Sequence, residues 1–135
     1  MHVAVFNGSP RRNGNTARLC KLFCETLAAE DISSEIIQVG GVRVHGCLEC
    51  NHCRRSGEEV CVQKDDSFNE WFEKMRAADG IVLATPVFVG NVTSEMKALI
   101  DRACYISRMR VRVQGQDNIF KHKVAAPLIA VRRAG

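Results

Sequence analysis

The sequence predicts an α/β domain in which a doubly wound parallel sheet lies between two layers of helices. Strand-like segments at residues 3–6, 34–39, 81–84 and 124–131 alternate with segments whose apolar residues recur at helical spacing. Alternation of this kind is typical of parallel sheets with helices on both faces. With 135 residues, the chain can bury a core without disulfide support. We therefore expect a single domain over residues 1–135.

The first half of the chain predicts two strands with a helix between them. Residues 3–6 form a short apolar run that ends in turn formers at residues 7–10, as expected for a buried parallel strand. The pair Asn15-Thr16 can open a helix, whose apolar face is formed by Cys20, Phe23, Cys24 and Leu27. Residues 34–39 alternate enough between polar and apolar side chains to form the second strand.

The next helix and strand follow from a cap and an apolar run. Asp65-Asp66-Ser67 offers a helix N-cap, and Asp79-Gly80 ends that helix. Its apolar stripe is formed by Phe68, Trp71, Phe72 and Met75. Residues 81–84 are entirely apolar, which is typical of a central strand, and the run breaks at Thr85-Pro86.

The last third of the chain predicts a helix, a long loop and a strand. The helix follows Val92-Thr93-Ser94, and its apolar face is formed by Met96, Leu99, Ile100 and Ala103. Residues 105–123 are polar and basic, so we expect an extended loop there. Residues 124–131 read as a fourth strand in spite of Pro127.

Charge and hydropathy limit the classes of partner. The chain carries 19 Lys and Arg against 15 Asp and Glu, and its basic residues form small separate groups rather than one block. This pattern favours local anion contacts over nucleic-acid binding. The sequence lacks a signal-peptide pattern at its start and any run near the ~18 apolar residues of a membrane span. We therefore expect a cytoplasmic protein with neither a nucleic-acid nor a membrane partner.

The loop after the first strand has the composition of a phosphate site. Backbone N–H groups at the start of a helix carry partial positive charge and bind phosphate. The loop adds hydroxyl, amide and guanidinium donors, namely Ser9, Arg11, Asn13, Asn15 and Thr16. Its glycines, Gly8 and Gly14, match neither a Walker A loop nor Gly-x-Gly-x-x-Gly, which disfavours the common ATP and dinucleotide sites. The simpler alternative is a polar turn with a helix cap.

A second loop, at residues 85–91, should face the first. Ligands of doubly wound sheets lie at the carboxyl ends of the strands, near the switch in strand order, and in the order 2-1-3-4-5 strands one and three flank that switch. The loop offers a flat apolar surface with accessible backbone amides, formed by Pro86, Val87, Phe88 and Gly90. Such a surface suits a fused aromatic ring, although a turn that covers the core would read the same when taken alone.

Four of the seven cysteines lie within fifteen residues, at Cys47, Cys50, Cys53 and Cys61. In a reducing compartment such a group binds metal or performs redox chemistry more often than it forms disulfides. The first three form the compact Cys-x2-Cys-x2-Cys run favoured by cubane iron–sulfur clusters, whereas structural zinc more often uses two separated pairs. A 4Fe-4S cluster is the leading interpretation. Zinc, with His45 or His52 as substitute ligands, and unligated thiols stay open.

The remaining cysteines and the adjoining arginines have simpler interpretations. Cys20, Cys24 and Cys104 lie on or near apolar helical faces and are predicted as core residues. Arg54-Arg55 adjoin the cysteine stretch. They would offset the charge of a thiolate-ligated cluster or dock an acidic electron donor, and a solvated loop is an equal alternative.

The motifs together resemble the NADPH-dependent FMN reductase family. They are Gly-Ser-Pro-Arg-x-x-Gly-Asn-Thr at residues 8–16, Thr-Pro-Val-Phe-x-Gly-Asn at residues 85–91, and Lys97 followed by Asp101-Arg102. The cysteine stretch narrows the resemblance to the iron–sulfur flavoproteins within that family, in which the last cysteine gap varies. The resemblance implies a flavodoxin-like fold, bound FMN, and redox function in an oligomer, a homodimer or homotetramer.

On matching positions, the resemblance assigns a flavin site and a metal site. FMN would be bound at its phosphate end by Ser9, Arg11, Asn13, Asn15 and Thr16. The ring and ribityl chain would be contacted by Pro86, Val87, Phe88, Gly90 and Asn91. The metal ligands would be Cys47, Cys50, Cys53 and Cys61, in a cysteine-rich insertion at about residues 45–64. Family members usually continue past a strand such as 124–131 into a further helix and a fifth strand, whereas this chain stops at Gly135. Either the sequence is truncated, or the fifth strand is absent, or a partner subunit fills the gap. Without such a strand, the fourth strand would present an open edge.

The function expected from these features is that of an FMN-dependent oxidoreductase with a 4Fe-4S cluster. Electrons would pass from a one-electron carrier, such as a ferredoxin-like protein, or from NAD(P)H, through cluster and FMN to a small-molecule acceptor. The cofactors would supply the reactivity, and we assign no catalytic acid–base residue. Two alternatives stay open. One is a plain NAD(P)H-dependent FMN or quinone reductase without a cluster, and the other is a non-enzymatic flavodoxin-like module with structural zinc.

Overall fold

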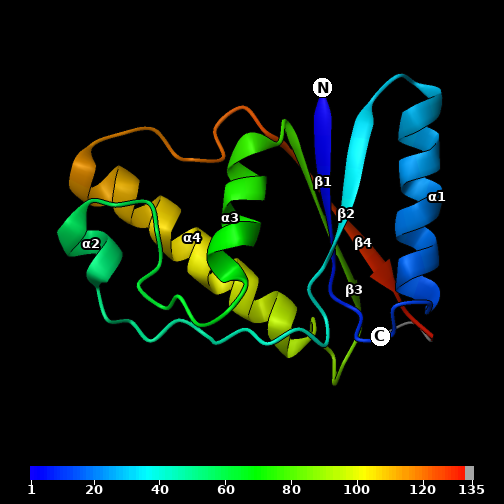
Figure 1. Cartoon of the computed structure of the whole chain (residues 1–135), viewed down its shortest axis with the longest axis horizontal. Coiled ribbons are helices and arrows are strands. Elements are labelled where there is room, and N and C mark those ends of the chain that lie inside the picture. Colours follow the sequence, from blue (N-terminus) through cyan, green and yellow to red (C-terminus); the bar gives the residue numbers. More distant parts are fainter. Residues whose placement is uncertain (133–135) are drawn as a thin grey trace.

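A parallel sheet of four strands forms the centre of the fold (Figure 1). A computed structural model describes residues 1–132, so that Arg133 and the chain end at Gly135 lie outside the described residues. The strands are β1 (His2–Asn7), β2 (Ser33–Gln38), β3 (Gly80–Pro86) and β4 (Val124–Ala130). The helices are α1 (Asn15–Ala29), α2 (His52–Ser56), α3 (Phe68–Ala77) and α4 (Ser94–Gln114). The sheet order β2-β1-β3-β4, all parallel, confirms the predicted fold class.

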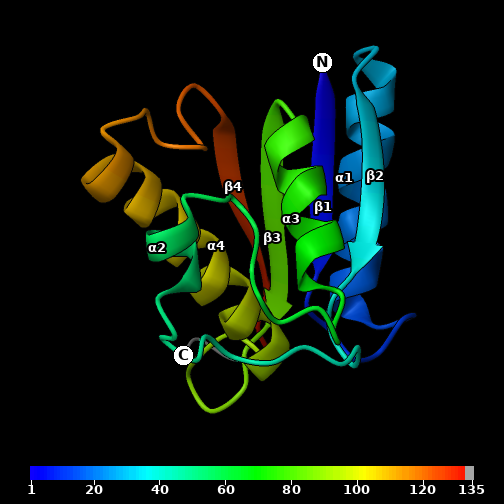
Figure 2. The ribbon, with the colours of Figure 1, turned by 60° about the vertical axis from the view of Figure 1, so that its left-hand side comes forward.

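The sheet is covered on both faces. Figures 1 and 2 show α1 on one face and α3 and α4 on the other. Because successive side chains of a strand point to opposite faces, alternate residues of β1 enter two different cores. Val3 and Val5 pack with Cys20 of α1, whereas Ala4 and Phe6 pack with the apolar faces of α3 and α4. The three layers follow directly from this pattern.

The main difference from the sequence prediction is the length of α4. We expected a loop over residues 105–123, but the helix continues to Gln114 and only the stretch from Gly115 to Lys123 connects it to β4. The apolar spacing does not stop at Ala103, since Ile106 and Met109 are also buried. Arginine is a good helix former, and Gly115, with a positive φ of 64°, ends the helix as a left-handed cap.

The other strand boundaries shift by one or two residues. The second strand starts at Ser33, one residue before the predicted start, and the fourth ends at Ala130. The cysteine stretch is irregular as expected, except that α2 includes Cys53. At the edge of the described sheet, β4 carries Pro127, which edge strands tolerate because one row of their N–H groups lacks a partner strand.

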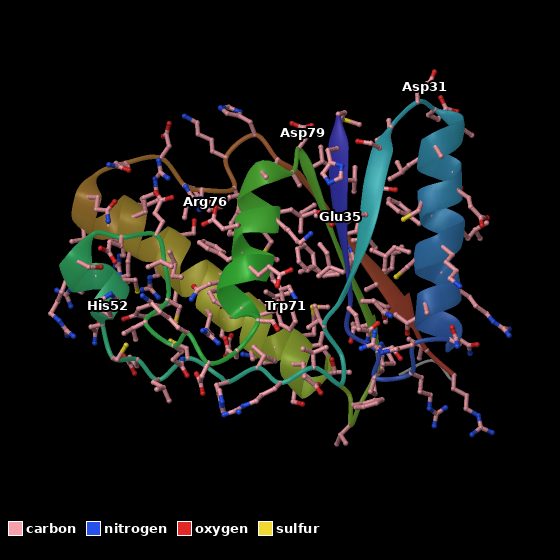
Figure 3. The ribbon with its side chains drawn as sticks, in the orientation of Figure 1. Asp31, Glu35, His52, Trp71, Arg76 and Asp79 are labelled. Carbon is pink, nitrogen blue, oxygen red and sulfur yellow. The ribbon has the colours of Figure 1, made fainter. Side chains whose placement is uncertain are left out.

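Polar contacts tie β1 and β2 to residues outside the sheet. Asp79 accepts a hydrogen bond from the His2 backbone N–H at 2.7 Å, and Glu35 of β2 accepts one from Lys74 of α3 at 2.6 Å (Figure 3). The loops after β1, β2 and β3 extend from the carboxyl end of the sheet, whereas residues 115–123 lead to the amino end of β4. Across residues 1–132 we find no helix that is both long and apolar enough to cross a membrane.

Candidate flavin and cysteine sites

The loop between β1 and α1 is shaped by its own hydrogen bonds. The Ser9 N–H donates to Asn7 Oδ1 at 3.1 Å, and the Arg11 N–H donates to Ser9 Oγ at 3.2 Å. Ser9 and Thr16 are buried, whereas Arg11 is exposed. Gly14 is the N-cap residue of α1, and among the described residues no side chain forms a capping hydrogen bond there. The first N–H groups of the helix are therefore available to an anion, as the phosphate prediction requires.

The loop after β3 closes as a tight turn. Phe88 and Asn91 exchange two backbone hydrogen bonds, at 2.8 and 3.0 Å, and the residues between them, Val89 and Gly90, have φ angles of 50° and 75°. Positive φ at both central residues defines a type I′ turn, in which Asn-Gly is preferred and a β-branched residue is strained. Val89 is fully exposed at the tip, so this strained residue presents an apolar side chain to solvent.

Short contacts at Gly8 hold the two loops against each other. The Gly8 N–H donates to the Ala84 carbonyl at 2.7 Å, and Thr93 Oγ1 donates to the Gly8 carbonyl at 2.8 Å. Gly40, after β2, packs so closely that an added Cβ would lie 2.3 Å from the Gly8 carbonyl oxygen. Only glycine fits there, and the carboxyl ends of three strands are locked together.

The two loops line one open cleft of about 770 Å³, within the roughly 300–1,000 Å³ range of ligand pockets. Seven of the predicted cofactor residues line it, namely Ser9, Arg11, Asn15, Thr16, Pro86, Val87 and Phe88. Asn13, Gly90 and Asn91 are exposed and do not line it. Residues not singled out from the sequence include Arg18, Leu19 and Leu22 of α1 and Ile129 to Arg132 at the end of β4. The cleft has a polar end at α1 and an apolar wall.

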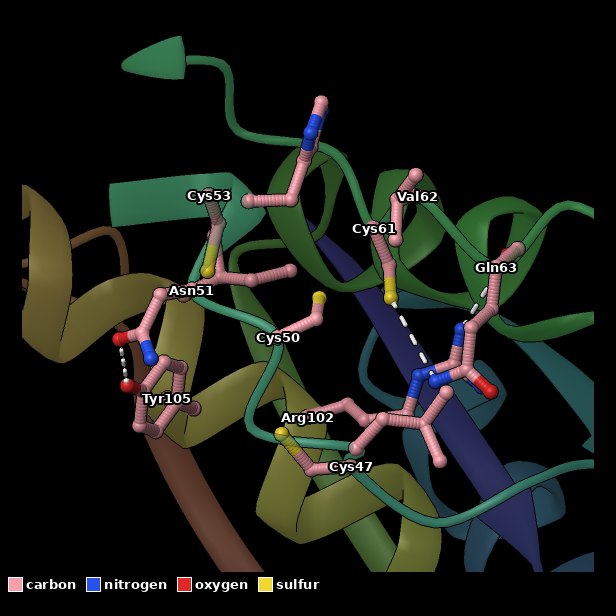
Figure 4. A pocket seen from close by; sticks show the side chains of 12 residues that line it. Cys47, Cys50, Asn51, Cys53, Cys61, Val62, Gln63, Arg102 and Tyr105 are labelled. Atoms are coloured by element: carbon pink, nitrogen blue, oxygen red, sulfur yellow. Dashed lines mark hydrogen bonds between the residues drawn. The ribbon is translucent and has the colours of Figure 1, made fainter. Parts of the chain in front are cut away.

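The four cysteines of the motif line a second hollow, between the cysteine stretch and α4 (Figure 4). Cys47 and Cys50 are exposed, whereas Cys53 and Cys61 are half-buried. Burial raises the pKa of the Cys53 thiol, and the nearby charges of Cys47, Cys61 and Cys50 raise it further. The structure therefore brings together the residues that the spacing motif grouped, including the more distant Cys61.

Two amide side chains fix Cys61. Asn69 of α3 accepts a hydrogen bond from the Cys61 N–H at 2.8 Å and donates one to its carbonyl at 2.9 Å, as a neighbouring strand would. Gln63 Nε2 donates to the Gly46 carbonyl at 3.1 Å and lies 3.9 Å from Cys61 Sγ (Figure 4). Gln63 thus joins the two ends of the cysteine stretch.

The turn between Cys50 and Cys53 is held from α4. Asn51 has a positive φ of 59°, which asparagine tolerates better than most residues. Tyr105 of α4 donates a hydrogen bond to Asn51 Oδ1 at 2.8 Å, and Asn51 Nδ2 donates to the Glu49 carbonyl at 2.9 Å. This contact explains how a stretch with little regular structure keeps a defined path.

A buried ion pair lies at the base of the cysteine stretch. Arg102 Nη1 donates to Asp66 Oδ2 at 2.5 Å, and both side chains are almost fully buried. Burial alone would raise the pKa of Asp66. Hydrogen bonds from Arg102 and from the backbone N–H groups of His45 and Phe68 outweigh it, so that the pKa of Asp66 is lowered. Asp66 therefore stays ionised opposite the arginine.

The four thiols are soft ligands, which suit iron–sulfur clusters or zinc. Among residues 1–132, no three His, Cys, Asp or Glu side chains are grouped so as to hold a metal ion. All four cysteines line the same hollow, as a cluster whose iron atoms each take one cysteine requires. His52 lines the hollow, whereas His45 Nε2 lies 3.5 Å from Asp65.

The other three cysteines lie outside this hollow. Cys20 is fully buried as predicted, and burial, with a smaller contribution from Cys24, raises its pKa to about 11. Cys24 is half-buried against the same core. The core prediction for Cys104 is wrong, since this residue is exposed on α4. The sequence places Cys104 near the end of an apolar helical face, but α4 continues, and its buried face passes through Ala103 and Ile106 instead.

The whole chain matches one known protein family. Residues 1–135 match the model of the family described as NADPH-dependent FMN reductase. The chain belongs to this family. Membership of the NADPH-dependent FMN reductase family supports FMN as a cofactor.

Curated relatives of this FMN reductase family member carry the name iron-sulfur flavoprotein. One from Methanocaldococcus jannaschii is 38% identical over 103 residues, covering 76% of this chain and 52% of the relative. One from Methanosarcina thermophila is 33% identical over 128 residues, covering 95% and 62%. The chain therefore spans little more than half the length of these relatives.

Solved structures share the fold at low sequence identity. The crystal structure of RosB superposes with a TM-score of 0.77 at 20% identity, covering all of this chain and 54% of that one. The NAD(P)H:quinone oxidoreductase from Methanothermobacter marburgensis gives a TM-score of 0.67 at 15% identity, covering 99% and 88%. This likeness confirms the flavodoxin-like fold of the FMN reductase family member.

Several residues that build the cysteine hollow were not predicted from the sequence. Asn69, Gln63 and Tyr105 act through contacts with residues far along the chain, and no local pattern indicates them. Arg102 gave a weak signal, because a charged residue among Leu99, Ala103 and Ile106 on a helix is unusual and needs a partner.

Proposed function

We propose that this protein is an iron–sulfur flavoprotein, an oxidoreductase in which a cysteine-bound 4Fe-4S cluster and FMN carry electrons between a donor and an acceptor. One observation carries the proposal. The compact Cys-x2-Cys-x2-Cys run and Cys61 line a single hollow in the same molecule as a phosphate-ready cleft. When bound, the cluster supplies one-electron transfer and FMN couples it to two-electron chemistry.

The proposed FMN site uses the polar end of the cleft for the phosphate. Ser9, Arg11, Asn15 and Thr16 line that end, where the α1 N–H groups add partial positive charge. Pro86, Val87 and Phe88 line the apolar wall against which the ring would stack. Gly90 and Asn91 shape this wall indirectly, because they close the turn that presents Phe88. Asn13, an exposed residue of the same loop, is also proposed to contact the phosphate.

The proposed cluster ligands are Cys47, Cys50, Cys53 and Cys61. Gln63 and Asn69 orient Cys61, and Tyr105 fixes the turn that separates Cys50 from Cys53. The compact spacing of the first three cysteines favours a cluster over zinc, and the names of the relatives point the same way. Half-burial of Cys53 and Cys61 limits the access of water to the bound group.

α4 connects the two proposed sites. Its N-cap residue, Thr93, binds the Gly8 carbonyl beside the flavin cleft. Arg102, at the cysteine hollow, follows nine residues later on the same helix, which corresponds to roughly 14 Å at the helical rise of about 1.5 Å per residue. One rigid element thus sets the separation of the cysteine hollow from the flavin cleft.

The donor, the acceptor and the assembly are part of the proposal. Arg54 and Arg55 are exposed on α2, beside the cysteines, and suit an acidic one-electron carrier such as a ferredoxin-like protein. NAD(P)H is the alternative donor, and the open cleft suits a small-molecule acceptor. We further propose a homodimer or homotetramer in the cytoplasm.

The test is anaerobic purification followed by an absorption spectrum and a count of iron, sulfide, zinc and FMN. The proposal expects about four iron and four sulfide per chain with bound FMN. FMN without iron, together with rapid flavin reduction by NADPH, would establish a plain NAD(P)H-dependent FMN or quinone reductase instead. Tight zinc without flavin turnover would establish a flavodoxin-like module with a structural zinc site.

A further inference from the structure

Arg102 is the one side chain of permanent charge among the described residues that line the cysteine hollow. It is only 1% exposed. It projects from α4, and in Figure 4 it lies between Cys47 and Cys61. A buried guanidinium is costly unless it is paired and hydrogen-bonded. Its place beside four thiols therefore calls for a physical reason.

Four contacts fix the Arg102 guanidinium. Nη1 donates to Asp66 Oδ2 at 2.5 Å and to the His45 carbonyl at 3.0 Å, and Nη2 donates to the Gln63 carbonyl at 3.3 Å. The guanidinium carbon lies 4.0 Å from the centre of the Phe68 ring. His45 and Gln63 stand at the two ends of the cysteine stretch, so Arg102 holds both ends of the segment that carries the thiols.

Of the three guanidinium nitrogens of Arg102, Nε alone makes no hydrogen bond within the described residues. In the part of the chain that the structure describes, its Nε–H is buried and has no hydrogen-bond partner. Leaving a buried charged donor unpaired is unfavourable, which indicates an acceptor that the protein chain itself does not supply. Arg110 also has an unpaired Nε, but its side chain is 27% exposed and does not line the hollow.

A thiolate-ligated cluster supplies such an acceptor. It is anionic, its sulfur atoms accept hydrogen bonds, and its reduction adds a further negative charge. Positive charge and N–H donors beside it therefore favour the reduced form. We propose that Arg102 is the electrostatic anchor of the cluster and raises its reduction potential, while Asp66 limits this effect as the counter-charge. The inference rests on the proposed function and deepens it.

The ion pair allows two variants with opposite expected effects. Arg102→Gln removes the positive charge and leaves the Asp66 carboxylate, so the cluster potential should fall. Asp66→Asn leaves the arginine without its counter-charge, so the potential should rise. If the pair only supported the fold, loss of either partner would disturb the site without shifts of opposite sign.

The experiment compares the anaerobically purified holoprotein with R102Q, D66N and the matched control Arg108→Gln, which removes an exposed arginine from the same helix. Potentiometric titration follows the cluster by electron paramagnetic resonance and the flavin by absorbance. We expect the cluster potential to shift at least tenfold in the one-electron equilibrium, which is about 59 mV. The shift should be downward for R102Q and upward for D66N. The control and the flavin potential should stay at the wild-type value.

Variants that keep their iron and their wild-type cluster potential overturn the inference. If R102Q loses its iron, D66N decides alone, because an upward shift supports the proposal and an unchanged potential refutes it. Absence of iron from the wild-type protein is a different result, since it refutes the proposed function and this inference with it.

Discussion

Asn69 fixes the position of Cys61, the cysteine whose spacing in the motif is irregular. Cys61 lies eight residues after Cys53, with no regular spacing to guide it. The Asn69 amide pairs with both the N–H and the carbonyl of Cys61, at 2.8 and 2.9 Å. Because the partner stands on α3, the position of Cys61 is tied to the core rather than to the loop. Its placement in the hollow therefore does not depend on the length of the gap.

Replacement of Cys61 tests its role as a ligand. Serine offers a harder oxygen donor, which suits iron–sulfur chemistry less than thiolate does. We expect Cys61→Ser to lower the iron content per chain at least twofold after anaerobic purification, as measured by a colorimetric iron assay. Cys104→Ser is the matched control and should keep wild-type iron, because Cys104 lies outside the hollow. Full iron in the Cys61 variant would exclude it as a ligand.

Thiol reactivity should separate Cys20 from Cys104. Burial raises the pKa of Cys20 to about 11. Only the thiolate is alkylated, and at pH 8 a thiol of this pKa is ionised to about one part in a thousand. Burial and the charge of Asp101 also raise the pKa of Cys104, but that residue is exposed. Iodoacetamide should therefore modify Cys104 at least tenfold faster than the fully buried Cys20, as read by peptide mass spectrometry. Because the pKa of Cys20 is higher in the folded protein than in the unfolded chain, its contribution to the free energy of unfolding is complete below about pH 9. That contribution is lost as the pH rises toward 11. Equal labelling at pH 8 would contradict the burial.

Among the elements, the type I′ turn after β3 is under strain. Val89 adopts a φ of 50°, which is unfavourable for a β-branched residue, and its side chain is fully exposed. Val89→Asn should raise the free energy of unfolding by about 0.5–1 kcal/mol, because Asn-Gly is the preferred pair in such turns. Urea titration of the far-ultraviolet circular dichroism measures it.

A matched control for the turn comes from another exposed valine. Val113 lies within α4, where asparagine is no better a helix former than valine. Val113→Asn should therefore give no gain in stability. An equal gain in both variants would mean that loss of exposed apolar surface, and not the relief of strain at Val89, is responsible.

The elements also show how far the sequence predicts this fold. Apolar runs such as Val3–Phe6 and Ile81–Ala84 predict their strands because a strand buried on both faces must be apolar throughout. The sequence predicts a loop over the second half of α4, because arginines surround the buried residues Ile106 and Met109 and make the segment polar overall. A helix that is buried along only a narrow stripe looks like a polar loop in sequence.

For the molecule as a whole, the loops proposed to bind flavin and the cysteines proposed as ligands could be grouped from sequence, but the residues that support them could not. Ser9 to Thr16 and Pro86 to Phe88 are contiguous segments at strand ends, and sheet topology brings them together. Arg102 meets His45 and Asp66 across 57 and 36 positions of the chain. Contacts of this kind follow from packing of α4 against the cysteine stretch and leave no periodic signal.

The two sites are built from different segments, which predicts that they can be lost separately. The cleft uses the loops after β1 and β3, whereas the hollow uses the stretch between β2 and α3 together with the middle of α4. Arg11→Gln should weaken FMN binding about tenfold or more, because a charge-assisted phosphate contact contributes roughly 1.5–3 kcal/mol. Its iron content should not change.

The neighbouring variant Arg12→Gln is the control, since Arg12 does not line the cleft. Conversely, Cys50→Ser should lose iron and keep stoichiometric FMN. Flavin fluorescence titration and iron analysis of the three variants measure both sites in the same preparations. If Cys50→Ser also loses FMN, or Arg11→Gln also loses iron, the cleft and the hollow form one cooperative unit. The coupling would then run through α4, because it is the element that touches the loop at Gly8 and carries Arg102 into the hollow.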